Sequence, residues 1–137
     1  MKPAEANHPD RKSGKAAGVG GVFLRAADPE KLYAWYEEHL GLKRTPDGAF
    51  AFFSEAPREM TVLGFFPRDT DYFGPGKQQA MLNIRVDDID AVLERLRTLG
   101  AVIDPKREDY DYGRFAWFND LEGNRVELWQ PPGIQEP

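Results

Sequence analysis

Apolar and polar positions alternate near the start of the chain and then change to a helical spacing. Residues 22–26 alternate in the manner of a β-strand. Asp28-Pro29-Glu30 follows, with a capping carboxylate, a proline suited to the first helical position and an acid in the first turn. Apolar residues then recur at helical spacing as far as Leu40, and Gly41 ends the segment. This stretch predicts a strand followed by a helix.

The same order recurs around Asp88, so the chain contains an internal repeat. Residues 82–86 alternate as a strand, Asp88 supplies the cap, and apolar residues follow at helical spacing as far as Gly100. Each predicted helix is followed by short, aromatic-rich strand candidates, at 50–53, 60–66, 114–118 and 125–130. The chain is therefore predicted to hold two βαβββ modules in tandem.

The predicted fold is α+β, a curved mixed sheet built from the two modules with the helices behind it. A single module would expose a whole sheet face, so we expect one shared domain. The predicted boundaries are a disordered tail at 1–17, a single domain at 18–132 (module 1 at 18–67, a linker at 68–78, module 2 at 79–132) and a C-terminal tail at 133–137. The front of the sheet is where a ligand would bind.

The composition narrows the possible chemistry. The 137 residues include no cysteine, which excludes a disulfide scaffold, thiolate catalysis, an iron–sulfur cluster and a zinc site built on sulfur. The net charge of −5 argues against nucleic-acid binding, which normally needs a basic face. No apolar run approaches the roughly 20 residues that span a bilayer, and the N-terminal segment lacks the apolar stretch of a signal peptide. We expect a cytoplasmic globular protein without nucleic-acid or membrane partners.

Three segments in order carry a family resemblance. They are Leu40-Gly41-Leu42 after the first helix, Arg85-Val86-Asp87-Asp88 at the start of the second, and residues 119–129 near the end. The last segment is similar to an Asp-Pro-x-Gly-Asn turn with an aliphatic-Glu-Leu strand, with Leu121 in place of the proline. On these features the chain resembles the vicinal oxygen chelate superfamily, which includes glyoxalase I, bleomycin-resistance proteins, fosfomycin-resistance enzymes and extradiol dioxygenases. The resemblance covers about residues 18–132 and implies the glyoxalase/bleomycin-resistance fold.

The resemblance implies one divalent metal, held by His, Gln or Glu on the first strand of each module and by Glu on a last strand. Only Glu127 matches such a position. The other matching positions hold Gly21, Met81 and either Leu63 or Gly64, none of which binds a divalent ion. A shift of two residues in the second module would bring in Asn83, a weak ligand. We therefore predict a member without the metal cofactor.

Strand alternation and the family's geometry together predict which side chains share a face with Glu127, the candidate catalytic residue. The predicted substrate-binding residues are Phe23, Arg25, Asn83, Arg85, Phe115, Trp117 and Trp129. Aromatic walls with arginines suit a planar or partly anionic small molecule. The alternative is structural: the arginines would form internal ion pairs with Glu127 or stand at the rim, and the aromatic rings would fill a collapsed core.

Four functions remain open at this point. The first is a metal-free protein of the bleomycin-resistance type that binds a small organic molecule. The alternatives are a metal-dependent lyase, isomerase or dioxygenase, a metal-free enzyme with Glu127 as general base, and an assembly subunit with a closed cavity. The family's shape favours a homodimer. Residues 107–114 fit either a lid or substrate-contacting loop or, as we favour, a solvated connection.

Overall fold

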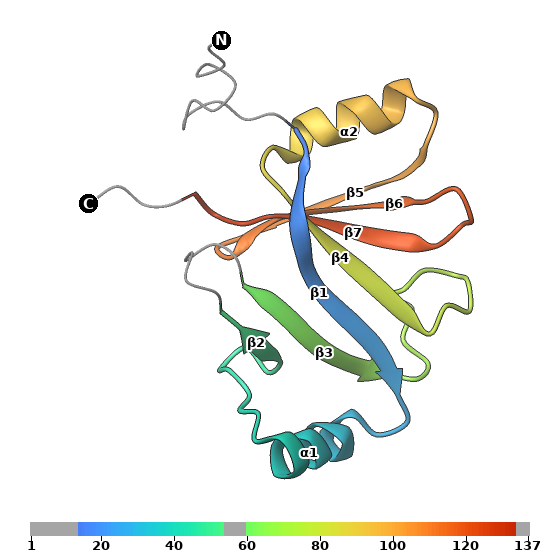
Figure 1. The fold of residues 1–137 in the computed structure, drawn as a ribbon. Coiled ribbons are helices and arrows are strands. Elements are labelled where there is room, and N and C mark those ends of the chain that lie inside the picture. The colour runs from blue at the N-terminus through green and yellow to red at the C-terminus, as the bar shows by residue number, and fades with distance from the viewer. Residues whose placement is uncertain (1–13, 54–59, 134–137) are drawn as a thin grey trace.

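The computed structural model describes residues 14–53 and 60–133, and within these ranges seven strands form one curved sheet with two helices (Figure 1). The elements in chain order are β1 (Ala16–Ala26), α1 (Pro29–Leu40), β2 (Phe50–Phe52), β3 (Thr61–Pro67), β4 (Ala80–Val86), α2 (Ile89–Thr98), β5 (Val102–Tyr110), β6 (Gly113–Asn119) and β7 (Arg125–Gln130). Across the sheet the strand order is β2-β3-β1-β4-β7-β6-β5. The predicted α+β class and mixed sheet are confirmed.

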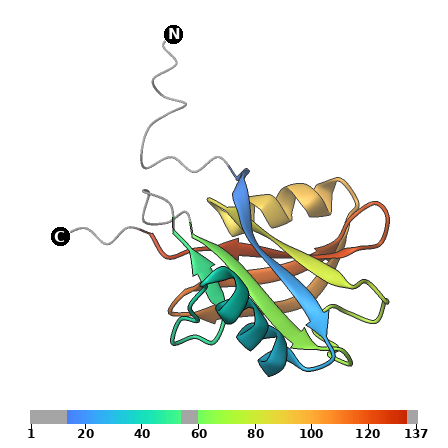
Figure 2. The same cartoon turned by 60° about the horizontal axis from the view of Figure 1, so that its bottom comes forward.

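The two modules join at the centre of the sheet, where β1 pairs antiparallel with β4. Within the modules, β1 pairs parallel with β3 and β4 pairs parallel with β7, as expected for an internal repeat. Figures 1 and 2 show α1 beside the β2–β3 end of the sheet and α2 beside the β5–β7 end. The modules therefore pair within one chain and make one continuous surface.

Both helices begin as the sequence predicts. The Asp28 side chain accepts a hydrogen bond from the backbone N–H of Lys31, and Asp88 accepts one from Ala91, each at 3.1 Å. These carboxylates satisfy backbone donors that a helix N-terminus leaves free. Gly41 ends α1 in the left-handed region at φ 70°, which only glycine adopts without strain.

The two faces of the sheet have different neighbours because side chains alternate along each strand. One face packs against the helices: Ala26 and Phe65 join Tyr33 of α1, and Val86 and Leu128 join Leu93 of α2, in two separate apolar clusters. A third cluster, Phe73, Met81 and Trp117, is fully buried beside the opposite face. The opposite face is the one that a ligand can reach.

The first module departs from the predicted βαβββ order, since in the described residues only β2 and β3 follow α1. The chain after the helix makes a single β-bridge, Arg44 to Phe50, and then turns tightly. Thr45 and Ala49 close that turn with a backbone hydrogen bond of 2.9 Å, and Gly48 takes φ 97°. The Arg44–Phe50 bridge is therefore all of the third strand that forms among the described residues of this module.

The second module has all three strands after its helix, because residues 102–110 form β5. The sequence favours a solvated connection at 107–114, and Pro105 interrupts the alternation before it. The strand instead passes the proline through an irregularity in its pairing with β6 between Ile103 and Arg107, which is where a strand tolerates proline. Segment 107–114 is the end of this strand, a tight turn and the start of β6, and is thus part of a hairpin.

The predicted tail and linker also differ from the structure. Residues 1–13 and 134–137 lie outside the described residues, but 16 and 17 already belong to β1. Lys15 donates its backbone N–H to Asp87 at 2.9 Å, and Arg95 donates to the Gly14 carbonyl at 2.6 Å. The 68–78 segment packs against the sheet, since Phe73 is fully buried. The ordered domain therefore begins before residue 18, and the linker forms part of its core.

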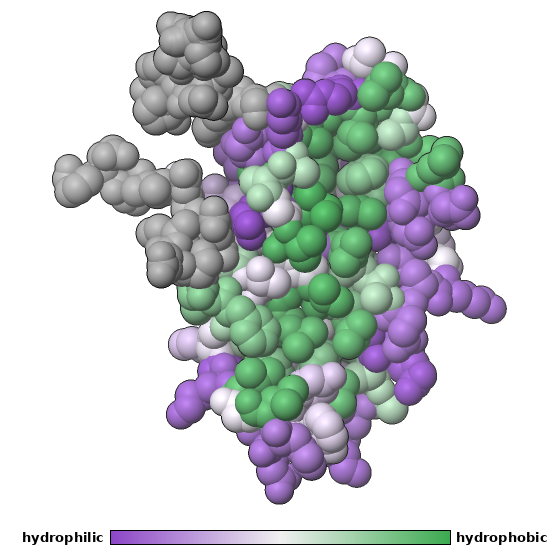
Figure 3. All heavy atoms as spheres, in the orientation of Figure 1, coloured by the Kyte–Doolittle hydropathy of each residue, from purple (hydrophilic) through white to green (hydrophobic). Residues whose placement is uncertain are grey.

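The surface carries both charged and apolar regions. In the orientation of Figure 1, hydrophobic side chains run down the middle of the molecule and hydrophilic ones border them (Figure 3). Val19 and Leu82, on the central strands, stay nearly half exposed. Neither α1 nor α2, the helices of the described ranges, is long and apolar enough to cross a bilayer.

Candidate functional site

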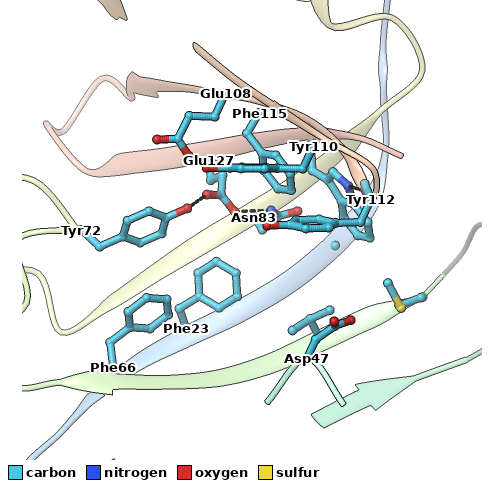
Figure 4. A pocket seen from close by; sticks show the side chains of 14 residues that line it. Phe23, Asp47, Phe66, Tyr72, Asn83, Glu108, Tyr110, Tyr112, Phe115 and Glu127 are labelled. Carbon is cyan, nitrogen blue, oxygen red and sulfur yellow. Dashed lines mark hydrogen bonds between the residues drawn. The ribbon is translucent and has the colours of Figure 1, made fainter. Parts of the chain in front are cut away.

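A cavity of about 500 Å³ lies on the face of the sheet away from the helices (Figure 4). Its walls come from both modules and from the two segments that the sequence left as connections. The lining residues are Gly20, Phe23, Asp47, Met60, Val62, Phe66, Tyr72, Asn83, Glu108, Tyr110, Tyr112, Phe115, Glu127 and Trp129. Half of them are aromatic. A cavity of this size and composition is typical of small-molecule sites.

Glu127 on β7 is the most buried carboxylate of the cavity, with a relative exposure of 1%. Three donors hold it: the Tyr72 hydroxyl, the Asn83 amide N–H at 2.6 Å and the Trp117 indole N–H at 3.0 Å. The dashed lines in Figure 4 mark the first two. Oε2 accepts from Tyr72 and Trp117, whereas Oε1 accepts from Asn83. The carboxylate is thus fixed in position and still has lone-pair capacity.

Burial changes the pKa of both Glu127 and Tyr72. Removal from water raises the pKa of Glu127, and the hydrogen bonds from Tyr72, Asn83 and Trp117 oppose that rise. Burial and the neighbouring Glu127 carboxylate raise the pKa of Tyr72 far above its usual 10, so the hydroxyl keeps its proton. Tyr72 therefore acts as a donor to Glu127 throughout the ordinary pH range.

Asn83 stands opposite Glu127 in the sheet register, and Gly21 and Val62 continue the same row across β1 and β3. The family resemblance assigned the matching ligand position of the second module to Met81. The structure places Asn83, two residues further along β4, opposite Glu127. The carboxylate can only accept, which orients the Asn83 amide with its N–H toward Glu127. Its Oδ1 has no hydrogen-bond partner among the described residues and lies against Gly20, where any Cβ would overlap it.

The aromatic rings of the cavity are arranged in stacked pairs. Phe115 and Trp129 are parallel with centroids 6.2 Å apart, and Phe66 and Tyr72 are parallel at 5.1 Å. Tyr110 and Tyr112 stack at 5.0 Å and stay about half exposed, so they stand at the open rim. The Trp129 indole donates to the Tyr112 carbonyl at 2.8 Å, which anchors the rim turn to β7.

The predicted site residues separate into two groups. Phe23, Asn83, Phe115, Glu127 and Trp129 all line the cavity. Trp117 is fully buried behind Glu127 and reaches it only through the indole N–H.

Arg25 and Arg85 lie outside the cavity lining. Arg25 donates to the backbone carbonyls of Arg68, Thr70 and Gln78 at 2.8–2.9 Å, so it clamps the 68–78 segment. Arg85 is buried and donates to the Met60 carbonyl at 3.0 Å. In the described part of the chain neither arginine forms an ion pair with Glu127, and neither lines the cavity as predicted, because both guanidinium groups are held by backbone carbonyls.

Four lining residues sit on the two segments for which the sequence favours a connection, although it leaves 107–114 open as a substrate-contacting loop. Tyr72 comes from the predicted linker, and Glu108, Tyr110 and Tyr112 come from the predicted loop. The aromatic content of both segments was the available signal: exposed connections rarely carry so many rings. Asp47 had no such signal, because the tight turn before β2 is what brings its side chain to the cavity.

The donor set at the row of Glu127 does not fit a divalent metal. A catalytic metal site uses about three protein ligands with free lone pairs. Here Glu127 already receives three hydrogen bonds, Asn83 turns its N–H toward it, and the remaining positions hold Gly21 and Val62. No cluster of three or more His, Cys, Asp or Glu side chains with metal-binding geometry occurs among residues 14–53 and 60–133.

Comparisons with known proteins agree with this architecture. The model of a glyoxalase-like domain matches residues 21–129, and no curated protein matches the chain. A methylmalonyl-CoA epimerase from Mycobacterium tuberculosis is 24% identical, with a TM-score of 0.59 over 93% of this chain and 96% of its own. A Streptomyces coelicolor methylmalonyl-CoA epimerase in complex with 2-nitronate-propionyl-CoA is 11% identical, with a TM-score of 0.69 over 87% and 100%. At these identities the two structures show a shared fold.

Proposed function

The chain belongs to the glyoxalase-like domain family, within the vicinal oxygen chelate superfamily, and we propose that it binds a small organic molecule in the cavity of its curved sheet. The binding would not use the divalent metal that the resemblance implies. One observation carries the proposal: a cavity of about 500 Å³ whose wall is half aromatic and whose most buried polar group, Glu127, is fixed by three donors. Such walls supply contact area while few polar groups fix orientation.

The rigidity of the cavity wall supports binding rather than collapse. Arg25 and Arg125 both hold the 68–78 segment, the latter through the Tyr72 carbonyl at 3.1 Å, and Arg125 also ties the segment to β5 through Asp104 at 2.9 Å. Gln78 adds hydrogen bonds to Arg125 in both directions. A wall held by so many backbone contacts is preorganised, which lowers the entropic cost of binding.

A second candidate is a metal-free enzyme in which Glu127 moves a proton. The observation that favours it is a carboxylate that lines the cavity and is 1% exposed; burial raises the pKa of such a group, as in general acids and bases. Two structural neighbours that share this fold are named as epimerases, which supports an enzyme as a candidate. The two candidates share the cavity and differ in whether a bound molecule is altered.

Thermal shift with paired cavity variants tests the proposal. A library of small organic molecules and separate Mn²⁺, Fe²⁺, Ni²⁺ and Zn²⁺ samples would be screened against the wild type. A ligand at 100 times its dissociation constant stabilises by about 2.7 kcal/mol. Val62→Trp fills the cavity, whereas Val102→Trp adds the same ring to an exposed position on β5.

We expect organic hits whose shift is abolished by Val62→Trp and retained by Val102→Trp, with no shift from the metals. Hits that survive Val62→Trp would place binding elsewhere and overturn the proposal. One metal per chain, lost with Glu127→Ala, would favour the metal-dependent enzyme instead. Nuclear magnetic resonance spectra of each hit, recorded before and after incubation with protein, would reveal turnover and so decide for the second candidate.

A further inference from the structure

We propose that the ligand of this cavity is an organic cation: a protonated amine or quaternary ammonium group carried on a flat apolar skeleton. The inference rests on the proposed function, because it names the class of molecule that the cavity binds. It differs from the partly anionic ligand that the sequence alone favoured, and the difference comes from where the charged side chains lie.

The charges that line the cavity are all acidic. Asp47, Glu108 and Glu127 contribute carboxylates, and no lysine, arginine or histidine is among the lining residues that the structure describes. They come from the β2 turn, β5 and β7, so acidic groups face the space from three sides (Figure 4). An anionic ligand would meet repulsion here, while a cation would be attracted from each side.

The nearest cations are engaged elsewhere. Arg25 and Arg85 donate to backbone carbonyls, and Arg125 pairs with Asp104 at 2.9 Å. Lys106 is the exception that touches the lining, since it lies 2.9 Å from Glu108. It offsets one of the three carboxylates. Arg125 lies close enough to act electrostatically on Glu127, but it stands outside the lining. Among the lining residues that the structure describes, Asp47 and Glu127 therefore have no basic partner.

The aromatic wall is suited to the same charge. Seven rings border the cavity, and the faces of tyrosine, tryptophan and phenylalanine attract cations within about 6 Å. The stacked pairs Phe115–Trp129 and Tyr110–Tyr112 meet edge-on through Phe115, whose ring centroid lies 6.0 Å from Tyr110 and 5.6 Å from Tyr112, so they form one continuous aromatic wall. Aromatic rings combined with carboxylates are the usual recognition elements for ammonium groups.

The hydrogen-bonding capacity left at the most buried part of the cavity is acceptor capacity. Asn83 Oδ1 has no partner among the described residues, and its side chain is 2% exposed. The neighbouring Glu127 Oε1 receives only the hydrogen bond from Asn83. An N–H of a protonated amine would meet acceptors there, whereas a ligand carboxylate would add another acceptor to unpaired ones.

Three matched probes test the charge class: 2-phenylethylammonium, neutral 2-phenylethanol and anionic phenylacetate. Each would be titrated at constant ionic strength into ¹⁵N-labelled full-length protein, with the Trp129 indole and Asn83 amide resonances as reporters. Glu127→Gln removes one cavity charge and keeps the shape of the side chain. Glu122→Gln removes an exposed charge in the turn before β7 and serves as the control.

We expect the ammonium probe to bind about tenfold more tightly than the alcohol, and phenylacetate to bind most weakly. Glu127→Gln should remove most of the difference in affinity between the ammonium probe and the alcohol, and Glu122→Gln should leave that difference intact. If Glu127→Gln fails to fold, Glu108→Gln at the half-buried wall should reduce the same preference. A preference that survives the cavity variant would refute the role of the carboxylates.

The outcomes separate this inference from the function on which it rests. Equal or tighter binding of phenylacetate or phenylethanol, reported by Trp129, would overturn the cation class and keep the cavity as a binding site. No change at Trp129 or Asn83 with any probe would count against the cavity itself and thus against both statements.

Discussion

Tyr72→Phe is the most informative single change, because it removes one hydroxyl and keeps the ring. That hydroxyl donates to the buried Glu127 carboxylate, while the ring stacks on Phe66 and meets Trp117 edge-on at 6.0 Å. A hydrogen bond to a charged group contributes about 1.5–3 kcal/mol. We therefore expect the free energy of unfolding to fall by about 2 kcal/mol, which at this chain length lowers the Tm by roughly 6–10 °C.

The loss should depend on pH with a defined sign. Glu127 has a raised pKa, so at low pH it is protonated and the bond to Tyr72 is between neutral groups, which contributes about 0.5–1.5 kcal/mol. The penalty of Tyr72→Phe should accordingly grow as the pH rises and Glu127 ionises. Tyr72 itself keeps its proton over this range because its own pKa is raised.

Urea unfolding at several pH values measures the effect, with Tyr112→Phe as the matched control. Tyr112 is exposed at the rim, and its change should stay within about 0.5 kcal/mol. A double-mutant cycle with Glu127→Gln isolates the pair, and we expect a coupling energy above about 1 kcal/mol. A Tyr72→Phe protein as stable as the wild type, with no coupling to Glu127, would refute the hydrogen bond between Tyr72 and Glu127.

The other predictions concern charge, the clamp, the N-terminal boundary and assembly. Glu127→Gln should become relatively more stable as pH rises: a raised pKa means that the stability contributed by Glu127 is complete below 4.5 and is lost as pH rises through the folded value, which urea titrations will follow. Arg25→Ala should lower stability by about 2–3 kcal/mol and accelerate hydrogen exchange over 68–78, because three carbonyls lose a charged donor; unchanged exchange would contradict the clamp. Deletion of residues 1–17 should lower the Tm, since it removes the start of β1 and the contacts of Gly14 and Lys15. An unchanged Tm would show that residues 14–17 do not contribute to the stability of the domain. We expect a homodimer, so light scattering should give twice the chain mass of 15.5 kDa, and the mass of a single chain would contradict this expectation.

Local sequence signals predicted the elements that depend on local physics. The caps at Asp28 and Asp88 are each completed within three residues, so the helix starts could be read directly. The strand of Glu127 was also found, because alternation and the turn before it depend on neighbours in the chain: Asp120 accepts from the backbone of Glu122 and Asn124, even with Leu121 exposed in the turn.

The misplaced features all depend on distant contacts. Arg25 alternates onto the predicted cavity face, but backbone carbonyls some fifty residues away capture its guanidinium. The exchange of Asn83 for Met81 opposite Glu127 follows from the β4–β7 register, and β1 carries an irregularity between Val19 and Gly21 that brings Gly20 to the cavity. Tyr72 reaches Glu127 only after the 68–78 segment folds back. No local pattern encodes such pairings.

A crystal structure with the most stabilising ligand from the thermal-shift screen tests the central claim most directly. We expect density in the cavity between the Tyr110–Tyr112 rim and Phe23, with a polar or charged end of the molecule directed at Glu127. The side chains of the cavity wall should move little from their positions in the ligand-free protein. Density confined to the outer surface, with Tyr110, Phe115 and Trp129 closed over an empty space, would contradict it.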